Sequence, residues 1–501
     1  MDSSGSVLPS PAKSIWQQRV DAAQLGRDAL PRVRLTVSER RVLLAVVDMV
    51  LLNLGLLAIL VARGGFPFSW LTVQKNPHYL LLLSALWLLW TLFFDCYDLP
   101  RTATAGHSAW GAGSAAVFTT VSYLLIPYIT PDLLDSRLSA LLFVVTVTGS
   151  IGLWRLAYAT VLSQPSFQQR ILIVGAGESG RELAQALADT PQHGNPYAGS
   201  GYRLIGFVDD DPNKLEAVIE GIPVLGNRHQ LLHLVRAYDI DLIVIAITYS
   251  PQIHPELFQF LLDCREQGLS LESMTSLYER LTGKVSVQHA GRNLGVVVPH
   301  ADSPTRHLSS AAKRLFDLFV GLVGLVVLAL VSPCIALANA LFSPGPLFYR
   351  QERVGKGGRV FWVYKFRSMV PTAEKECGAV WAAKNDSRIT PVGQILRKTR
   401  LDELPQFWNV LKGDMSLIGP RPERPEFVTE LMRVVPFYQA RHAVRPGITG
   451  WAQVRYPYGS SVEDALAKLQ YDLYYIKRQS LYLELSIMAK TVTVMLGLQG
   501  R

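Results

Sequence analysis

Long apolar segments constrain the fold of this chain more than any other feature of its sequence. Four of them follow one another in the N-terminal part, at residues 43–62, 79–94, 109–129 and 138–158. A helix needs ~20 predominantly apolar residues to cross the hydrocarbon core of a bilayer. A buried bundle in a soluble protein is the alternative, but runs with so little charge are rare outside membranes. We therefore predict a transmembrane region of four helices over residues 42–162.

Basic residues set the expected orientation of these helices. Residues 1–41 form a polar, basic segment, whereas the two presumed outer loops carry only Arg63 and Lys75 in one and Arg137 in the other. Because Lys and Arg concentrate on the cytoplasmic side, we expect Met1 in the cytoplasm. After four crossings the chain would return there near Gln164. The N-terminal segment is not a secretory signal peptide, since its apolar run begins too late and is too long.

Composition agrees with a membrane protein that carries sizeable soluble parts. The chain has 501 residues, of which 49% are hydrophobic and 18% charged, and its mean hydropathy is +0.20. This length exceeds that of one ordinary domain. The net charge of +9 at pH 7 suits an anionic partner such as a phospholipid surface, a lipid phosphate or a nucleotide. Nucleic acid would fit the charge as well, but it is not among the partners that we expect.

The pattern changes after the fourth apolar segment to alternating strands and helices. This alternation predicts a doubly wound, Rossmann-like α/β domain at residues 165–300. Its first strand is followed by Gly175, Gly177 and Gly180 in the GxGxxG spacing of dinucleotide-binding loops. In that interpretation the glycines admit a pyrophosphate and Asp209 binds a ribose hydroxyl. Because Asp209 lies further along than the usual ~20 residues and no hydride-transfer group is evident, we expect at most a bound nucleotide and no redox catalysis.

A fifth apolar run, at residues 312–342, is interrupted by Ser332 and Pro333. A proline inside a membrane helix removes a backbone hydrogen bond and bends the helix, and a serine hydroxyl can bond a freed carbonyl. A plain spanning helix would carry everything after it to the outer side, away from nucleotides. We therefore predict a re-entrant helix hairpin that returns to the cytoplasm, with Lys313 and Arg314 at the anionic inner leaflet.

Charged residues gather in the segment LRKTRLDELPQFWNVLKGDMSLIGPRP at residues 396–422. Pro405 in a first turn and Gly413 just past the end predict a short helix, with Asp402 at or beside its N-cap and Glu403 in its first turn. A capping Asp with solvated charge around it is the plain alternative. A carboxylate that attacks phosphorus would need a different set, namely cations and Arg forks that hold the phosphate. Arg397, Arg400 and Arg421 supply such a set.

Two further segments carry basic residues. Residues 351–367 predict two strands joined by a Gly-rich turn, with Lys365 and Arg367 on one face, although exposed edge strands also favour Lys. Residues 445–451, RPGITGW, predict a loop that can cradle phosphate or uracil beside Arg445. Trp451 fits the hydrophobic core equally well.

Together these segments resemble the bacterial sugar transferase family. The resemblance is carried, in chain order, by KRLFD, VYKFRSM, the 396–422 segment and RPGITGWAQV. It covers residues 309–501, and the layout upstream resembles the large, multi-domain members. The family's polyprenyl-phosphate sugar-1-phosphate transferases move a sugar 1-phosphate from a UDP-sugar to polyprenyl (undecaprenyl) phosphate and release UMP. This is the first membrane step of exopolysaccharide, capsule or O-antigen synthesis.

The resemblance also implies roles for single residues. Asp402 would be the nucleophile that forms a covalent phosphosugar intermediate, and Glu403 would bind Mg²⁺. Phosphate would be bound by a set of basic residues, Lys365, Arg367, Arg397, Arg421 and Arg445. The middle domain would be regulatory or structural, the protein a homodimer, and the catalytic domain would lie on the cytoplasmic face of the bacterial inner membrane.

Two other classes of function stay open from the sequence. One is a membrane-anchored nucleotide-sensing protein in which the Rossmann-like domain is the active part. The other is a membrane-anchored sugar-nucleotide dehydratase or epimerase, which would carry a nicotinamide cofactor. No residue fixes the sugar or the length of the lipid.

Overall fold

The computed structural model describes most of the chain after its basic N-terminal segment. The described residues are 36–62, 76–131, 136–162, 167–188, 201–247, 253–288, 305–371, 373, 386, 388–456, 459 and 461–496. They belong to two compact units, Met1–Leu281 and Thr282–Arg501. Arg63, Lys75 and Gln164, on which part of the expected orientation rests, lie outside the described residues.

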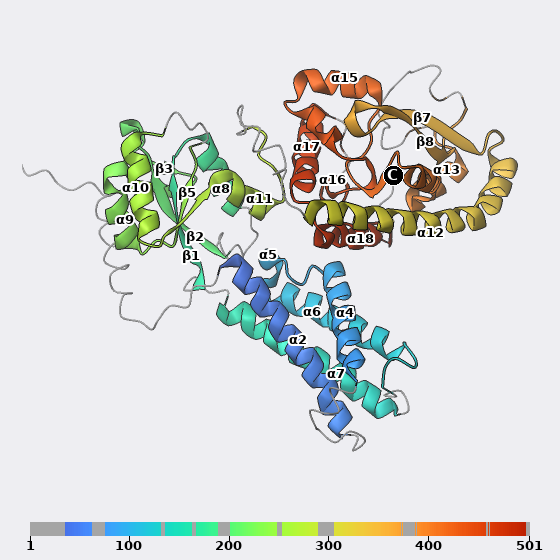
Figure 1. The fold of residues 1–501 in the computed structure, drawn as a ribbon, viewed down its shortest axis with the longest axis horizontal. Helices are drawn as coiled ribbons and strands as arrows, with labels where there is room; N and C mark the ends of the chain where they lie inside the picture. Colours follow the sequence, from blue (N-terminus) through green and yellow to red (C-terminus); the bar gives the residue numbers. More distant parts are fainter. Residues whose placement is uncertain are drawn as a thin grey trace, which may run out of the picture. The chain divides into compact units, whose positions relative to one another are not determined.

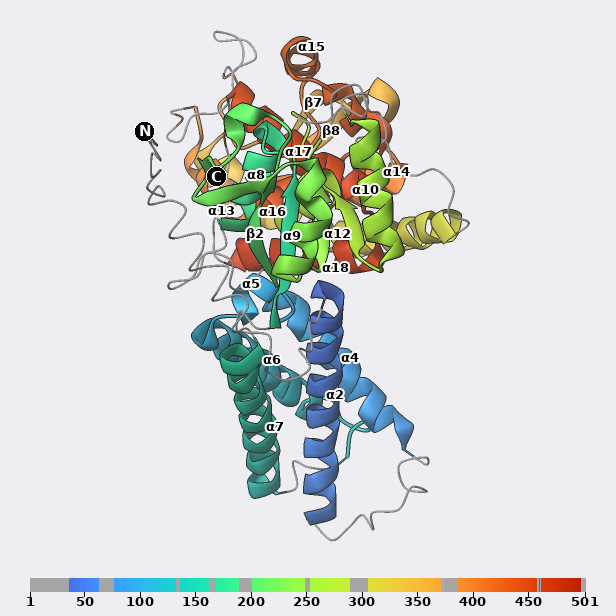
Figure 2. The same cartoon turned by 90° about the vertical axis from the view of Figure 1, so that its left-hand side faces the viewer.

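Four apolar helices of the first unit pack lengthwise into a bundle (Figures 1 and 2). They are α2 (Val37–Ala62), α4 (Pro77–Phe93), α6 (Ala105–Leu124) and α7 (Arg137–Ala157), with the short α5 (Leu99–Thr102) and the π-helical turn η2 (Tyr158–Leu162). By length and composition α2 and α7 can cross a membrane, α4 is shorter, and α6 does not qualify. The predicted four crossings are therefore not confirmed.

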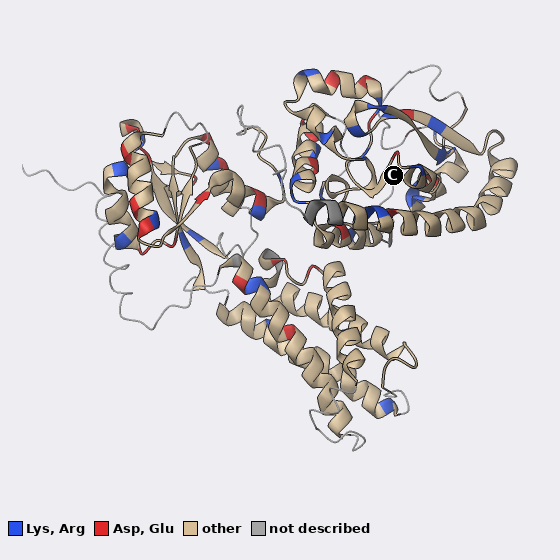
Figure 3. Ribbon diagram, viewed as in Figure 1, with Lys and Arg blue, Asp and Glu red and all other residues tan. Residues whose placement is uncertain are grey.

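One buried ion pair joins α2 to α7 inside this bundle. Arg155 donates to the two carboxylate oxygens of Asp48 at 2.5 and 3.3 Å and to the carbonyl of Cys96 at 2.7 Å. The other charged residues of the four helices, Glu39, Arg40, Arg41 and Arg137, lie at the N-terminal ends of α2 and α7, and the rest of the four helices carries no charge (Figure 3). Because a charge among apolar helices must be matched internally, this pair fixes how α2 and α7 face each other.

The rest of the first unit is built around a parallel sheet, as predicted. Its strand order is β3-β4-β2-β1-β5-β6, and only β3 and β4 pair antiparallel. The strands are β1 (Gln169–Val174), β2 (Tyr202–Val208), β3 (Val218–Ile219), β4 (Ile222–Gly226), β5 (Leu242–Ile245) and β6 (Ser270–Ser273). The helices are α8 (Glu178–Ala188), α9 (Leu231–Tyr238), α10 (Pro255–Glu266) and α11 (Met274–Thr282), with the 3₁₀ turns η4 (Pro212–Lys214) and η5 (Arg228–Gln230). The strand order reverses at β1, beside the Gly-rich loop.

The second unit mixes helices with short strands. The predicted hairpin is β7 (Phe348–Val354) and β8 (Val360–Phe366), joined by η8 (Lys356–Gly358). Strands β9 (Ser416–Ile418) and β10 (Gly447–Thr449) pair in parallel. The other elements are α12 (Thr305–Phe342), α13 (Pro391–Thr399), η9 (Leu401–Glu403), α14 (Gln406–Lys412), α15 (Pro425–Val434), η10 (Tyr438–Ala443), α16 (Trp451–Arg455), α17 (Val462–Lys477) and α18 (Leu481–Leu496).

The core of the second unit begins before α12. Val285 and Val287 are 0% and 3% exposed and pack in the same apolar cluster as Trp451. The indole Nε1 of Trp451 donates to the carbonyl of Gly283 at 2.9 Å, so this tryptophan belongs to the core. We expected residues up to 300 to belong to the middle domain and the catalytic domain to start at 309. By the contacts between its residues the second unit starts at Thr282, and the predicted domain bounds stay a prediction.

Helix α12 follows the second unit along most of its length. Near its start, Lys313 Nζ lies 2.7 Å from Glu484 of α18, and Arg314 donates to the carbonyls of Val410 and Leu411 at the end of α14. Both side chains therefore bond partners in the protein, and their expected place at the inner leaflet stays a prediction.

The remainder of α12 stays in contact with the same unit. A Cβ at Gly324 would come within 2.4 Å of the Phe407 ring, so helix and ring are in close contact there. Further along the helix, Ile335 packs with Phe366 and Leu396. The backbone passes through Ser332 and Pro333 as one helix, with the Ser332 hydroxyl bonded to the carbonyl of Leu328 at 2.6 Å. The predicted re-entrant helix hairpin within residues 312–342 is therefore not confirmed.

Candidate active site

Asp402 and Glu403 lie in the single 3₁₀ turn η9, between α13 and α14. Arg400 ends α13 in the left-handed region, with φ 61°, and so redirects the chain into this turn. Helix α14 ends at Gly413, with φ 93°, as predicted. Asp402 was expected at or beside the N-cap of this helix. Pro405 takes that position instead, because the chain forms a separate turn before the helix starts.

Three cations surround the carboxylate of Glu403. Arg421 and Lys365 lie 2.9 and 3.3 Å from its Oε1, and Arg400 lies 3.7 Å from its Oε2. The residue is 8% exposed. Burial alone would raise its pKa, but Arg421, Lys365 and Arg400 together lower the pKa of Glu403 below the ordinary value. Glu403 is therefore ionised throughout the neutral range.

Asp402 is as buried as its neighbour but is not paired. It is also 8% exposed, and within the described residues its carboxylate makes neither a hydrogen bond nor an ion pair. Burial and the charge of Glu403 raise the pKa of Asp402 to about 6, although Lys365, Arg397 and Arg421 act in the opposite direction. The turn thus holds one carboxylate engaged by cations and one whose oxygens stay available.

Lys365 and Arg367 do not share a function in the structure. Lys365, near the end of β8, reaches Glu403, and burial lowers its pKa. Arg367 is buried elsewhere: it donates to the carbonyl of Pro346 at 2.7 Å and to the carbonyl of Ser343. Its guanidinium therefore fastens the turn after α12. The two side chains, expected on one face, have different partners because Arg367 lies just past the end of β8, and phosphate binding by Arg367 stays a prediction.

Two other predicted phosphate ligands differ in their surroundings. Arg397, on α13, is close enough to Asp402 to lower its pKa. Arg445 is exposed, and no contact places it with the two carboxylates. The glycines of its loop serve close packing: a Cβ at Gly447 would lie 2.1 Å from the amide nitrogen of Gly419. The loop thereby supports the strand that leads to Arg421.

The residues that hold the segment after this strand in place were not predicted from the sequence. They are Arg353 of β7, whose side chain is 19% exposed, and the buried pair Arg441 of η10 and Asp472 of α17, all close to residues 421 to 423. A signal existed for Asp472, because it is a lone carboxylate among the apolar residues of α17 such as Leu469 and Leu473. Nothing in the spacing of the sequence pairs it with Arg441.

Whether Mg²⁺ suits the site around Asp402 and Glu403 depends on the side chains that are present to bind the ion. Among the described residues, no three His, Cys, Asp or Glu side chains gather into a complete metal site. Magnesium in nucleotide-dependent enzymes commonly takes one or two carboxylates and completes its shell with substrate phosphates and water. Both oxygens of Glu403, the expected ligand, already lie within ion-pair distance of Lys365, Arg400 and Arg421, so magnesium binding at this residue stays a prediction.

Asp209, the residue expected to bind a ribose hydroxyl, contacts the Gly-rich loop of the middle domain. Its carboxylate accepts a hydrogen bond from the amide of Ala176 at 2.7 Å and forms an ion pair with Lys214 at 3.3 Å. Gly175 has φ 105°, which favours glycine. A Cβ at Gly180 would lie 2.2 Å from the carbonyl of Gly175, while one at Gly177 meets nothing within 4 Å. Whether this loop binds a nucleotide stays a prediction.

Comparison with known proteins identifies both parts of the chain. Residues 308–497 match the bacterial sugar transferase family, and residues 92–261 match a CoA-binding domain family. The chain is 33% identical to the UDP-glucose:undecaprenyl-phosphate glucose-1-phosphate transferase of Xanthomonas campestris pv. campestris, over 66% of this chain and 67% of that protein. The chain therefore belongs to the bacterial sugar transferase family.

Other relatives carry names with different sugars. The UDP-N-acetylgalactosamine-undecaprenyl-phosphate N-acetylgalactosaminephosphotransferase of Aeromonas hydrophila is 42% identical over 52% of this chain, and the match spans 60% of that protein. The UDP-galactose-lipid carrier transferase of Erwinia amylovora is 28% identical over 92% of this chain and 97% of that protein. The second match covers the apolar helices, the parallel sheet and the catalytic unit together.

Proposed function

We propose that the protein transfers a sugar 1-phosphate from a UDP-sugar to undecaprenyl phosphate and releases UMP. One observation carries the assignment of its active site. Asp402 is buried and unpaired within the described residues, whereas the adjacent Glu403 is held by three cations. Membership of the sugar transferase family and the names of the relatives support the reaction class.

In this proposal the Asp402 carboxylate attacks the β-phosphorus of the donor. The bond from that phosphorus to the bridging oxygen breaks, UMP departs with the oxygen, and a phosphosugar–aspartyl ester remains. An oxygen of undecaprenyl phosphate then attacks the same phosphorus, which releases Asp402 and forms the lipid diphosphate sugar. A covalent step lets one site serve a soluble donor and a membrane-bound acceptor in turn.

The surrounding cations have an electrostatic task. Lys365, Arg397 and Arg421 face Asp402 closely enough to lower its pKa, so they can also stabilise negative charge that develops on a phosphoryl group there. Mg²⁺, when bound with the donor, would supply further positive charge to the diphosphate. Glu403 is the carboxylate that would hold it.

The placement of α12 supports a site at the cytoplasmic membrane surface. Contacts near both ends of the helix lie in the same folded unit, Lys313 with Glu484 and Ser343 with Arg367. A helix that crossed the bilayer would carry these ends to opposite sides. We therefore infer that α12 enters the membrane and returns, and that the inner membrane is the location. The homodimer stays a prediction.

The proposed function is tested by following UMP release from a panel of UDP-sugars, with and without undecaprenyl phosphate. We expect lipid-dependent turnover with one sugar, and mass spectrometry after donor alone should find a phosphosugar adduct on Asp402. Steady turnover of Asp402→Asn would reject the mechanism. Nucleotide binding without turnover, or a purified nicotinamide cofactor, would instead favour the middle domain as the active part.

A further inference from the structure

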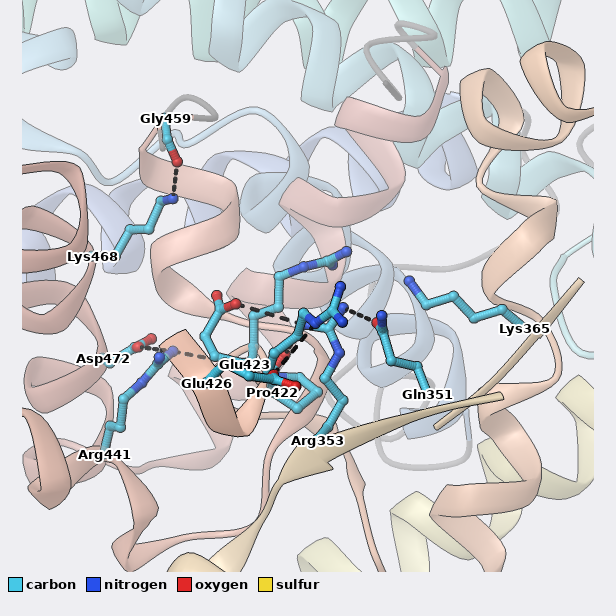
Figure 4. A network of polar contacts seen from close by, with 12 residues as sticks. Gln351, Arg353, Lys365, Pro422, Glu423, Glu426, Arg441, Gly459, Lys468 and Asp472 are labelled. Carbon is cyan, nitrogen blue, oxygen red and sulfur yellow. Dashed lines mark hydrogen bonds and ion pairs between the residues drawn. The ribbon is translucent and has the colours of Figure 1, made fainter. Parts of the chain in front are cut away.

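Two guanidinium groups, that of the buried Arg441 and that of the partly buried Arg353, hold the backbone that carries Arg421. Arg441 Nη2 donates to the carbonyl of Arg421 at 3.0 Å, and Arg353 Nη1 donates to the carbonyl of Pro422 at 3.1 Å. The two donors come from η10 and from β7, so consecutive carbonyls are fixed by separate parts of the unit. Figure 4 shows Arg353 reaching this segment from its strand.

Arg441 is itself held in one orientation. Its Nη2 lies 2.9 Å from Oδ2 of Asp472, and its Nη1 donates to the hydroxyl of Tyr438 at 2.5 Å. The two charged side chains are 6% and 2% exposed, and they point toward each other in Figure 4. Arg presents its donors in a rigid planar fork, which suits three fixed acceptors better than the single ammonium of Lys.

We propose that Arg441, fixed by Asp472, is a positioning residue of the active site: its bond to the carbonyl of Arg421 aims the guanidinium of Arg421 at Glu403. The backbone bond and the 2.9 Å contact with Glu403 belong to the same residue, so a shift of one moves the other. Misplacement by ~1 Å can cost on the order of 10²-fold in rate. The link to catalysis rests on the proposed function, whereas the backbone contact does not.

Hydrogen exchange in the full-length protein tests the backbone contact without any assay of activity. The amides of Gly447 and Val354 donate to the carbonyls of Pro420 and Glu423 on either side of the segment. In Arg441→Lys these two amides should exchange at least ~3-fold faster. Asp472→Asn should reproduce the effect. Arg367→Lys, a matched change at another buried Arg that bonds carbonyls, should leave them unchanged. Equal rates in Arg441→Lys and the native protein would overturn the proposal.

A double-mutant cycle on UMP release tests the link to Arg421. Arg441→Lys should lower the rate by about 10–100-fold in the native background, but by less than ~3-fold when Arg421 is already Ala, because the group that Arg441 positions is gone. Arg367→Lys should cost the same factor in both backgrounds. If Arg441→Lys lowers the rate by the same factor with and without Arg421→Ala, the link to Arg421 is overturned and Arg441 has only a general structural role. A native protein that releases no UMP would reject the proposed function alone, since the exchange result stands by itself.

Discussion

Asp402 and Glu403 are adjacent in one 3₁₀ turn and equally buried, yet only Glu403 has cations within ion-pair distance among the described residues. This difference in pairing indicates different roles for the two carboxylates. A carboxylate bound by Arg421, Lys365 and Arg400 is a poor nucleophile, because its charge is neutralised. An unpaired carboxylate close to the same cations can attack a phosphorus that they attract.

The first prediction concerns pH. Asp402 must be ionised to attack, and burial with the charge of Glu403 raises its pKa to about 6. The rate of adduct formation should therefore rise with pH, pass its midpoint near 6, and level off above. Single-turnover UMP release between pH 4.5 and 8.5 measures this. In Glu403→Gln the residual rate should have its midpoint at lower pH, because the neighbouring charge that raises the pKa is removed. A midpoint that stays at the same pH in Glu403→Gln would contradict the assignment of this pH dependence to Asp402.

The second prediction is that the two carboxylates affect stability with opposite sign. The folded pKa of Asp402 lies above its unfolded value, so ionising it destabilises the fold as pH rises from about 4 to 6. Asp402→Asn should therefore stabilise the protein at pH 7.5, on the order of 1–3 kcal/mol, and should have no effect below about pH 4.

Glu403 shows the reverse linkage. Its folded pKa lies below the unfolded value, so its stabilisation is present above about pH 4.5 and is lost as pH falls. Glu403→Gln at pH 7.5 should destabilise by about 1–3 kcal/mol. This is less than the ~3–5 kcal/mol for breaking a fully buried pair, because Arg421 and Arg400 are each 35% exposed. Thermal unfolding of both variants at pH 7.5 measures these changes in stability. Shifts of the unfolding midpoint in the same direction would contradict the opposite effects predicted for Asp402 and Glu403.

The sequence predicted the elements of this site better than their connections. Hydrophobic periodicity and turn residues located β7, β8 and the end of α14 at Gly413, since those signals are local. The partners of Arg367 and Arg441 depend on where distant segments pack. Arg367 bonds the turn after α12, and Arg441 bonds Asp472 on α17. No spacing within one segment encodes such contacts, so burial and distance had to come from the structure.

The third prediction concerns α12. Because its two ends contact one folded unit, residues 310 and 359, which are both exposed, should lie on the same side of the membrane. Cysteines introduced there one at a time, with Cys334 and Cys377 replaced by Ser and the buried Cys96 and Cys264 kept, should react with a membrane-impermeant thiol reagent only in inverted vesicles. A cysteine at Arg137, which is exposed and was expected in the second outer loop, serves as the control for labelling from outside. Labelling of only one of the two positions in intact cells would contradict the re-entrant placement.

The fourth prediction distinguishes two glycines of the middle domain. A Cβ at Gly180 would lie 2.2 Å from the Gly175 carbonyl, whereas one at Gly177 has open space. Gly180→Ala should therefore cost roughly 1–3 kcal/mol of stability as an overpacking change. Gly177→Ala should stay within ~0.5 kcal/mol and is the matched control. The unfolding midpoint of the purified protein measures both. Equal loss in the two variants would show that the motif is constrained by something other than packing.

The fifth prediction concerns the segment before α12. Val285 and Val287 are buried in the core of the second unit, and burying such side chains contributes ~1.5–3 kcal/mol each. A fragment that starts at Thr282 should therefore be more stable, by about 3–6 kcal/mol, than one that starts at Ser309, one residue after the start of the family match. In the full-length protein, Val285→Ala should lower the unfolding midpoint, while Val434→Ala, at a 57% exposed position of α15, should not. If the two fragments unfold at the same temperature, the segment is not part of the catalytic core.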